Sequence, residues 1–451
     1  MFENILGQSS AGQLANDIKN KSLAPAMLFE GPLSTGKGSA ALELSRVISC
    51  EKDGLWNCTC SACARHRLLL HPDLLCLGRR IFFAEIAAAG DVFTREMQSP
   101  PAKILFIRSV RKLLARFNPV LWEDEPKFKK LGGLVLSLEE DLDEVDALKT
   151  GTLNENNETA GKLIASIIKD AYKLESDGIS TTVPIEQIRR ASSWCHLTPF
   201  GKGKLLLLEN ADTMKEGARN SLLKLLEEPP VSVTVVLTSA RPNALMQTIL
   251  SRLRPYSFKA RSEDTEKEVL RRVFRIGAPV LEPQKASVSP ARSGLINAYL
   301  DSFMPVSGNT LRVLAAYFAA SAAFKAALLV RKKGAELPAE LVLLGKLSAP
   351  LAEEAGFAKS RESRETAAKI MEAASGFEVR SMFSDFCGFL LAVITESLKK
   401  SPAHLPSSFL FMELWRAHIH ETEKAVMTYN QNISLALERL FIDLSRGMAE
   451  I

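Results

Sequence analysis

A glycine-rich turn, GPLSTGK, starts at Gly31 and ends in Gly36 and Lys37. It has the G-x-x-x-x-G-K spacing of a loop whose backbone N–H groups and lysine surround the phosphates of a nucleotide. The next residue is normally Ser or Thr, whose hydroxyl holds Mg²⁺. Here it is Gly38, and Ser39 comes one position too late. We therefore expect a loop that can contact phosphate but lacks one ligand for the metal ion.

A second set of candidate residues follows an apolar run. Lys204–Leu208 leads into Glu209, and the next residue is Asn210. In nucleotide hydrolases, carboxylates at the end of such a strand bind the magnesium ion and orient the attacking water. The amide of Asn210 cannot act as a carboxylate base, so only Glu209 keeps its role. The pattern predicts the scaffold of a nucleotide site and argues against efficient hydrolysis.

Four of the seven cysteines gather in one short segment, at Cys50, Cys58, Cys60 and Cys63. Four thiolates on short stretches of chain can hold a structural Zn²⁺ tetrahedrally. The single residue between the second and third cysteines is awkward for a shared knuckle. Three interpretations stay open: zinc held by four cysteines, zinc with another ligand such as His66, and free thiols that bind no metal.

The elements that must position these residues alternate between strands and helices. Ala26–Glu30, Lys204–Leu208 and Val231–Thr238 are predicted strands, and Ser39–Ile48 has helical spacing. A continuous apolar strand is typical of a parallel sheet buried on both faces. Strands that alternate with helices predict a doubly wound α/β domain.

Two regions lie outside this pattern. Residues from about 79 to 178 change in character, and we interpret them as an insertion that is partly helical. An apolar stripe in it is flanked by the basic residues Arg108, Arg111, Lys112 and Arg116. Such a stripe indicates either a solvated helix face or a contact with a nucleic-acid backbone. After Phe258 the strands stop and helical patterns fill the remaining chain.

Composition excludes several classes of protein. With 46% hydrophobic and 24% charged residues, the chain is not wholly disordered. A net charge of +5 over 451 residues permits contact with nucleic acid but does not argue for it. No run approaches the roughly 18 apolar residues that span a bilayer, and the N-terminus lacks the basic start of a signal peptide. We expect a cytoplasmic protein of several domains with no membrane partner.

Several segments resemble the bacterial clamp-loader subunits of the AAA+ class. The most specific is NSLLKLLEEPP, at Asn220–Pro230. Gln247–Leu253 is similar to the segment with the family's Ser-Arg-Cys motif, although Leu253 replaces the Cys. Further similar segments are Phe2–Gln8, Leu28–Pro32, His71–Asp73 and Ile185–Arg189. The resemblance covers residues 1–78 and 179–258, and the helical remainder only loosely.

The resemblance implies an architecture and two site residues. It implies an α/β AAA+ P-loop domain over residues 1–258, with a zinc-type module at 50–63. A small helical lid domain over 259–335 and an all-helical collar for oligomerisation over 336–451 would follow. By position, Arg252 is the family's arginine finger, which acts on the nucleotide of a neighbouring subunit. Thr238 matches the place of the sensor hydroxyl that reads the γ-phosphate.

The family contains motor subunits (gamma/tau) with intact hydrolytic motifs and delta-prime subunits that often lose them. Gly38 and Asn210 favour the delta-prime type, without ATPase activity of its own. The resemblance implies structural Zn²⁺, gamma/tau and delta-type partners in a hetero-pentamer, and loading of the sliding clamp on primer-template DNA. We do not count ATP with Mg²⁺ among the expected cofactors of this subunit.

Two alternatives remain at this point. The first is an active gamma/tau-type clamp-loader ATPase, in which Ser39 replaces the missing metal ligand and Glu209 suffices for the chemistry. The second is a nucleic-acid-binding module that touches DNA through the cysteine segment and the Arg108–Arg116 stripe.

Overall fold

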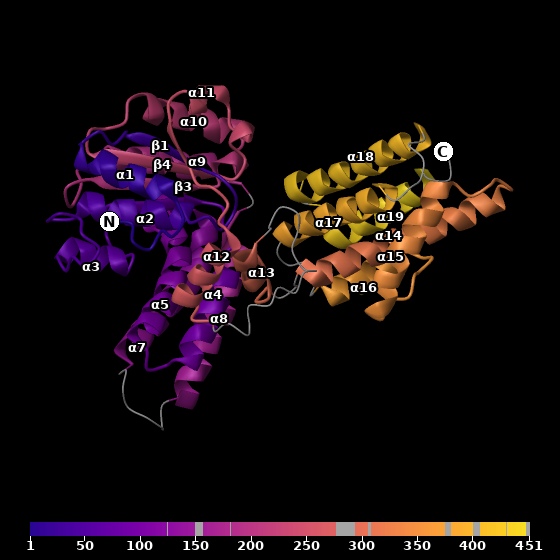
Figure 1. Ribbon diagram of the computed structural model, residues 1–451, viewed down its shortest axis with the longest axis horizontal. Helices are drawn as coiled ribbons and strands as arrows, with labels where there is room; N and C mark the ends of the chain where they lie inside the picture. Colours follow the sequence, from indigo (N-terminus) through magenta and orange to yellow (C-terminus); the bar gives the residue numbers. More distant parts are fainter. Residues whose placement is uncertain are drawn as a thin grey trace. The chain divides into compact units, whose positions relative to one another are not determined.

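The computed structural model describes residues 1–123, 125–148, 157–180, 182–276, 294–304, 308–374, 380–399, 406–429 and 431–447. These residues belong to two units (Figure 1). Among the described ranges, residues up to 276 and 294–300 belong to the first unit, and residues from 301 onward belong to the second. Residues 149–156 of the predicted insertion lie outside the described ranges.

Five parallel strands form the sheet of the first unit. Their spatial order is β2-β3-β4-β1-β5. The strands are β1 (Ala26–Glu30), β2 (Leu74–Gly78), β3 (Lys204–Glu209), β4 (Val233–Ser239) and β5 (Arg254–Ser257). Every residue of β3 and β4 is buried, because helices cover both faces of the sheet. The predicted α/β fold class is confirmed.

Two strands were not predicted from the sequence. β2 is a five-residue run (LLCLG), which is too short to distinguish from a helical segment by its pattern. β5 contains Pro255 and lies at the sheet edge, next to β1. Only one of its four residues is buried, which fits the confinement of proline to edge strands. β4 begins two residues later than predicted, because Val231 lies exposed in the preceding turn.

Helices cover the two faces of this sheet. Figure 1 shows α2 and α3 on one face and α9 and α10 on the other. The helices of the first unit outside residues 79–178 are α1 (Ser9–Lys19), α2 (Lys37–Ser49), α3 (Ser61–Arg67), α9 (Ile185–Cys195), α10 (Glu216–Glu227), α11 (Gln247–Leu250), α12 (Glu263–Val273) and α13 (Leu295–Asp301).

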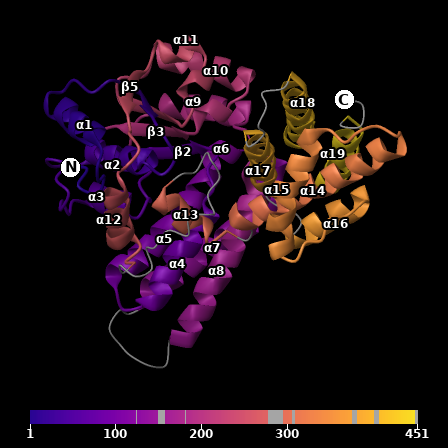
Figure 2. The same ribbon diagram turned by 45° about the vertical axis from the view of Figure 1, so that its right-hand side comes forward.

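Residues 79–178, called the helical segment below, pack together beside the sheet. They form α4 (Phe83–Arg95), α5 (Pro100–Leu114), α6 (Pro119–Trp122), α7 (Pro126–Ala147) and α8 (Asn157–Gly178). α4 packs on α5 and α8, and α7 packs on α8. Buried side chains such as Phe106, Leu138 and Ile167 fill the space between them. In Figures 1 and 2, α4, α5, α7 and α8 extend away from the sheet.

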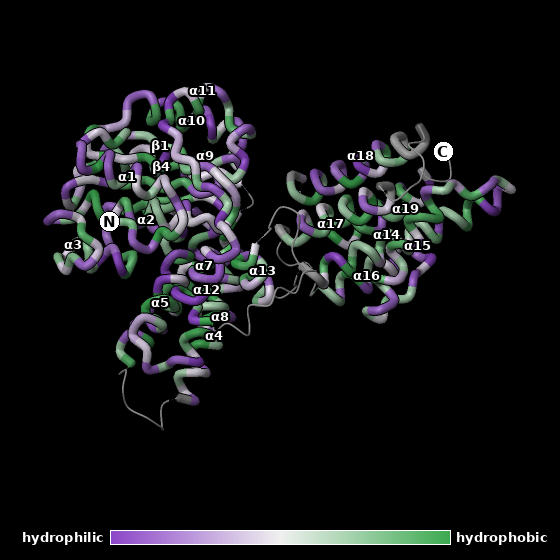
Figure 3. The backbone as a smooth tube through the Cα atoms, in the orientation of Figure 1, coloured by the Kyte–Doolittle hydropathy of each residue, from purple (hydrophilic) through white to green (hydrophobic). Residues whose placement is uncertain are grey.

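The described part of the second unit is helical. It contains α14 (Gly308–Lys332), α15 (Ala339–Glu354), α16 (Ser363–Ala373), α17 (Arg380–Lys399), α18 (Pro406–Tyr429) and α19 (Ile433–Gly447). One hydrophobic core joins all six helices, with Tyr317, Phe386, Trp415 and Leu440 at its centre. The hydropathy of each helix can be followed in Figure 3.

The α14 helix concerns two sequence predictions: the boundary between lid and collar, and the absence of a membrane-spanning segment. It shares its core with α15 to α19, although the predicted lid domain ended at residue 335 and the collar began at 336. The division into lid and collar stays a prediction. Thr310–Lys332 is long and apolar enough to cross a membrane, but 67% of its most apolar window is buried in the protein. It is therefore a core helix.

Candidate functional site

The glycine-rich turn connects the end of β1 to the start of α2. Gly31 has φ +135°, and a Cβ there would overlap the carbonyl oxygen of Phe258. Gly36 has φ +95° and directly precedes α2. Both glycines occupy left-handed backbone conformations that side chains rarely adopt. The turn therefore has the strand–loop–helix setting of a phosphate loop.

Lys37 points back into this turn. Its Nζ donates hydrogen bonds to the carbonyl oxygens of Gly31, at 2.6 Å, and of Pro32. The side chain is only 7% exposed. Burial lowers the pKa of Lys37 to about 8, against the attraction of Glu209 and Asp212. The ammonium group of Lys37 thus donates to carbonyl oxygens of its own loop, whereas the lysine of a nucleotide-bound phosphate loop donates to phosphate oxygens.

Two further side chains fasten the loop. Arg261 donates to the carbonyl oxygens of Ser34 and, at 3.1 Å, of Leu6. The Ser34 hydroxyl donates to Oδ1 of Asn297 at 2.5 Å. Residues from β5's C-terminal side and from α13 thus hold the loop in one conformation.

Glu209, the last residue of β3, is enclosed by arginines. It is 6% exposed. One carboxylate oxygen accepts from Arg80 at 3.2 Å, and the other accepts from Arg116. Burial raises the pKa of Glu209, but the charges of Arg80 and Arg116 outweigh burial, and the net pKa is below its usual value. Glu209 is therefore an ionised carboxylate with both oxygens occupied.

Gly38, the residue after Lys37, leaves no space for a metal-binding side chain. A Cβ at Gly38 would lie well under 3.0 Å from Glu209 Oε1 and 3.2 Å from Arg80 Nη1. Gly38 thus makes room for the ion pair. Ser39, the proposed substitute ligand, is one residue further along the first turn of α2.

Asn210 and Thr238 bond to protein groups. The Asn210 side-chain amide donates to the carbonyl oxygen of Arg79 at 2.7 Å. Its backbone N–H donates to the Thr238 hydroxyl at 3.0 Å. Asn210 has φ +50°, a conformation that asparagine tolerates better than most residues. The pair ties the ends of β3 and β4 together.

The basic stripe of the helical segment is neither solvated nor available to nucleic acid. Arg108 donates to the carbonyl oxygens of His66 and Arg67, and Arg111 to that of Leu68. Lys112 pairs with Glu85, and Arg116 pairs with Glu209. Both sequence interpretations of the stripe were wrong. The helix that carries it packs against the rest of the first unit, and its cations have internal partners.

Arg252 lies just after α11 and is bound to neighbouring helices. Its Nη2 pairs with Glu227 Oε1 of α10 at 2.6 Å, and its Nη1 donates to the carbonyl oxygen of Thr248 at 2.6 Å. The side chain is 32% exposed. Its guanidinium therefore remains partly accessible from outside.

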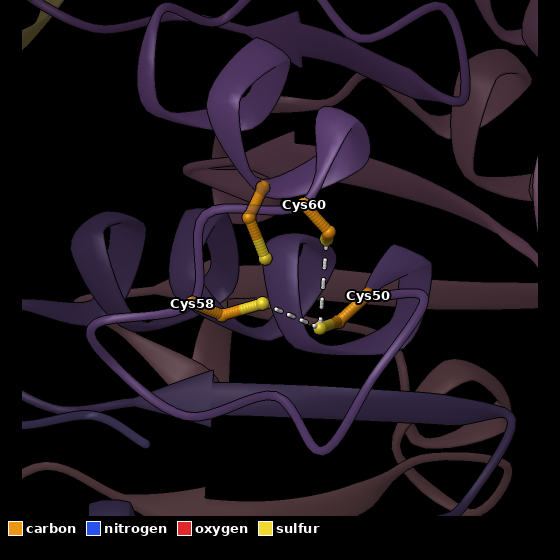
Figure 4. A group of neighbouring side chains, drawn as sticks. Cys50, Cys58 and Cys60 are labelled. Atoms are coloured by element: carbon orange, nitrogen blue, oxygen red, sulfur yellow. Dashed lines mark hydrogen bonds between the residues drawn. The ribbon is translucent and has the colours of Figure 1, made fainter.

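The four cysteines of the predicted module converge. Cys50 ends α2, Cys58 lies in the following loop, Cys60 precedes α3 and Cys63 lies within it. All four sulfurs lie within 4.8 Å of one another. Cys50 Sγ is 3.6 Å from that of Cys58 and 3.9 Å from that of Cys60 (Figure 4). Together they could hold one metal ion, despite the single residue between Cys58 and Cys60.

Hydrogen-bond donors lie around two of the cysteine sulfurs, although burial raises the pKa of the Cys63 thiol. The backbone N–H groups of Lys52 and Gly54 donate to Cys50 Sγ at 3.4 and 3.3 Å. Arg46 Nη1 donates to Cys63 Sγ at 2.9 Å and is itself held by Glu43. Hydrogen-bond donors stabilise the negative charge that a metal-binding sulfur carries.

His66, the alternative ligand, lies elsewhere in the packing. Its ring stacks on His71 with centroids 4.1 Å apart and is 3% exposed. Burial lowers the pKa of His66 to about 3, so the ring is neutral at pH 7. His66 does not belong to the group of side chains that converge on one point.

Two site residues, Arg80 and Arg116, were not identified from the sequence as partners of Glu209. Arg80 is 129 positions away from Glu209 along the chain, and Arg116 is 93 positions away. Local spacing contains no signal for such pairs, because only the packing of the helical segment brings them to β3.

Comparisons with known proteins agree on one family. The family model described as "DNA polymerase III, delta subunit" matches residues 7–118 and 148–262. The match therefore includes part of the predicted insertion and leaves out 119–147, which contain α6 and the whole of α7.

Three curated relatives are similar over shorter stretches. "DNA polymerase III subunit delta'" of Pseudomonas aeruginosa is 35% identical over 20% of this chain and 28% of its own length. The protein of the same name from Bacillus subtilis is 43% identical over 20% of this chain and 27% of its own. "DNA polymerase III subunit tau" of Bacillus subtilis is 31% identical over 24% of this chain and 20% of its own.

The chain thus spans less than a third of the length of each of these relatives. The family model, in contrast, matches half of the chain, including the nucleotide loop, the cysteine cluster and Arg252. The chain therefore belongs to the family of the DNA polymerase III delta subunit.

Proposed function

We propose that this chain is a clamp-loader subunit of the delta-prime kind, which hydrolyses no ATP itself. The observation that supports this most is the state of Glu209: both carboxylate oxygens are bound by arginines. The two guanidiniums compete with a metal ion or a water for these oxygens and neutralise the charge that would hold them. Asn210 offers an amide that is already bonded to the backbone. The pocket has a loop for phosphates but no catalytic carboxylate.

The subunit would contribute to catalysis in its neighbour through Arg252. A guanidinium that enters the neighbouring site neutralises charge on the transferred phosphoryl group. The partial exposure of Arg252 and its bonds to Glu227 and Thr248 suit a side chain that is held ready at the surface. Thr238 would have a structural role, since its hydroxyl accepts from Asn210.

The proposed partners follow from the family. They are gamma/tau and delta-type subunits in a cytoplasmic hetero-pentamer, the sliding clamp, and primer-template DNA reached through the complex. The helical collar, predicted over residues 336–451, would hold the subunits together.

We further propose that the cysteine cluster holds one structural Zn²⁺. With Zn–S distances of about 2.3 Å, tetrahedral geometry separates two sulfurs by about 3.8 Å. The Sγ–Sγ separations of 3.6 Å from Cys50 to Cys58 and 3.9 Å from Cys50 to Cys60 are close to this value. The ion would join the loop that follows α2 to α3. α2 is the helix that begins with Lys37.

The alternative function is an active ATPase of the gamma/tau kind, in keeping with the similarity to a tau subunit. ATP hydrolysis by the purified chain separates the two functions. We expect no turnover above background, because loss of a metal ligand and of the water-orienting carboxylate removes several kcal/mol of transition-state stabilisation. Turnover of roughly 1 s⁻¹, in the ordinary enzyme range, would identify a motor subunit.

The role of Arg252 is tested in the complex assembled with gamma/tau and delta-type subunits. Arg252→Ala should lower DNA-stimulated hydrolysis, since an arginine finger contributes about 10³–10⁵ in rate at the site it serves. Total turnover falls less, because other sites keep their own fingers. Assembly, measured by gel filtration, should not change.

Arg254→Ala provides the matched control. Arg254 lies two residues away, is 45% exposed and pairs with Asp17 within the subunit. Its loss should leave hydrolysis by the complex unchanged. Equal activity of the Arg252→Ala and wild-type complexes would contradict the proposed role.

A further inference from the structure

The carboxylate at the end of β3 is neutralised by protein cations. Arg80 and Arg116 come from the two ends of one stretch of the helical segment, before α4 and after α5. They take one oxygen of Glu209 each. Arg116 is 5% exposed, and an arginine cannot lose its charge at any physiological pH. Two permanent positive charges therefore lie against this carboxylate.

The guanidinium of Arg80 lies next to Gly38, where the motif would place a metal-binding side chain. In an intact phosphate loop, the side chain after the lysine points to the Mg²⁺. In this protein that side chain would start at Gly38, where a Cβ would lie 3.2 Å from Arg80 Nη1 and overlap Glu209 Oε1. Position 38 on α2 and Glu209 on β3 are the places from which protein groups would bind the metal. Both lie next to the guanidinium of Arg80.

We propose that Arg80 and Arg116 take the place of a divalent cation, so that the nucleotide loop of this chain excludes Mg²⁺. The residues do not fit the metal: one ligand is absent at Gly38, and the other, Glu209, is occupied. Any nucleotide that enters this loop is held without a metal ion. The inference rests on the proposed function, in which this chain hydrolyses no ATP, but it does not depend on a role for Arg252.

The surrounding packing holds both guanidiniums in place. Each lies over the buried ring of Phe82, at 5.7 Å for Arg80 and 5.3 Å for Arg116. Trp122 Nε1 donates to the carbonyl oxygen of Arg116 at 2.7 Å. Glu85 pairs with Arg80 and with Lys112. Arg80, Arg116 and Lys112 thus surround Glu85 and Glu209, so both carboxylates already have cationic partners.

The test uses Mn²⁺ as the metal, because its electron paramagnetic resonance signal changes when it binds. ATP binding to the full-length chain is measured by calorimetry with Mn²⁺ and with EDTA. For the wild type we expect no more than a twofold difference between the two conditions, and no protein-bound Mn²⁺ in the presence of ATP. Tenfold tighter binding with Mn²⁺ would overturn the proposal, whatever the outcome for ATP hydrolysis in the complex.

Arg80→Gln removes one charge and keeps much of the side-chain volume. We expect ATP to bind this variant at least tenfold more tightly with Mn²⁺ than with EDTA. Adding Glu209→Gln should abolish that difference. Arg189→Gln is the control, because Arg189 is 60% exposed and pairs only locally with Glu186; it should behave as the wild type.

A folded Arg80→Gln variant that is indifferent to Mn²⁺ would also overturn the proposal. Folding is checked by circular dichroism and thermal unfolding. Should the variant not fold, the comparison of Mn²⁺ and EDTA on the wild type still decides, since tight metal-dependent binding there is incompatible with an excluded cation.

Discussion

A serine at position 38 would restore the sequence of an intact phosphate loop, yet we expect it to destabilise the protein. The new Cβ would lie well under 3.0 Å from Glu209 Oε1. That oxygen cannot move away freely, because the carboxylate is fixed on both sides by Arg80 and Arg116. The serine that would complete the motif therefore collides with the ion pair between Glu209 and Arg80.

The size of the effect follows from two opposing contributions. Extra atoms in a well-packed site cost about 1–3 kcal/mol. A serine favours a helix over a glycine by roughly 0.5 kcal/mol. We therefore expect Gly38→Ser to lower the free energy of unfolding by about 0.5–2.5 kcal/mol. ATP hydrolysis should stay absent, because Glu209 remains occupied.

Chemical unfolding followed by circular dichroism measures this change. Gly12→Ser in α1 is the matched control: Gly12 has nothing within 4 Å of the position of a Cβ. There the same substitution should stabilise by roughly 0.5 kcal/mol, from helix propensity alone.

The collision also predicts coupling between positions 38 and 80. In an Arg80→Ala background, Glu209 can turn toward Arg116, and the cost of Gly38→Ser should fall. Contacting residues show coupling energies of about 0.5–3 kcal/mol in double-mutant cycles. A Gly38→Ser protein as stable as the wild type, with additive energies in the cycle, would refute the reasoning.

Two further predictions concern a buried acid and the cysteine cluster. Glu175 accepts from the backbone N–H groups of Phe82 and Phe83, and burial raises its pKa from 4.5 to about 7. The folded state thus binds the proton more tightly, so this group's contribution to stability is fully present below pH 4.5 and is lost as pH rises to 7. At about 1.4 kcal/mol per pKa unit, the loss is about 3 kcal/mol. Urea unfolding of Glu175→Gln should lack this part of the pH dependence, and identical profiles for variant and wild type would contradict it. For the cysteines, elemental analysis should find about one zinc per wild-type chain and far less in Cys63→Ser, with a lower unfolding temperature. Zinc-free wild-type protein, purified without chelator, would argue for free thiols.

Much of the fold could be predicted from local patterns. The apolar runs of β1, β3 and β4 are the buried strands that their composition predicts. Gly31 and Gly36 have the backbone conformations that only glycine adopts easily. Family membership, predicted from motifs such as NSLLKLLEEPP, is confirmed by the family match. These features are local, since a few neighbouring residues suffice to specify a strand, a turn or a motif.

Local patterns failed where charged residues were buried. The Arg108–Arg116 stripe reads as a solvated or nucleic-acid-binding face, because charged side chains are rarely buried without partners. Here its partners include Glu85 from α4, Glu209 from β3 and carbonyl oxygens that follow α3. Spacing along one helix contains no information about which acids face it.

The sequence by itself determined that a G-x-x-x-x-G-K turn is present, that Gly38 and Asn210 stand where the motif calls for a hydroxyl and a carboxylate, and that four cysteines lie near one another along the chain. Only the tertiary structure decided which side chains lie beside Gly38 and Glu209. Gly38 and Glu209 are far apart in sequence, as are Arg80 and Arg116, and they meet because the helical segment packs against the carboxyl end of β3. A buried carboxylate needs a compensating charge. Which cation provides that charge depends on which side chains the fold brings within bonding distance.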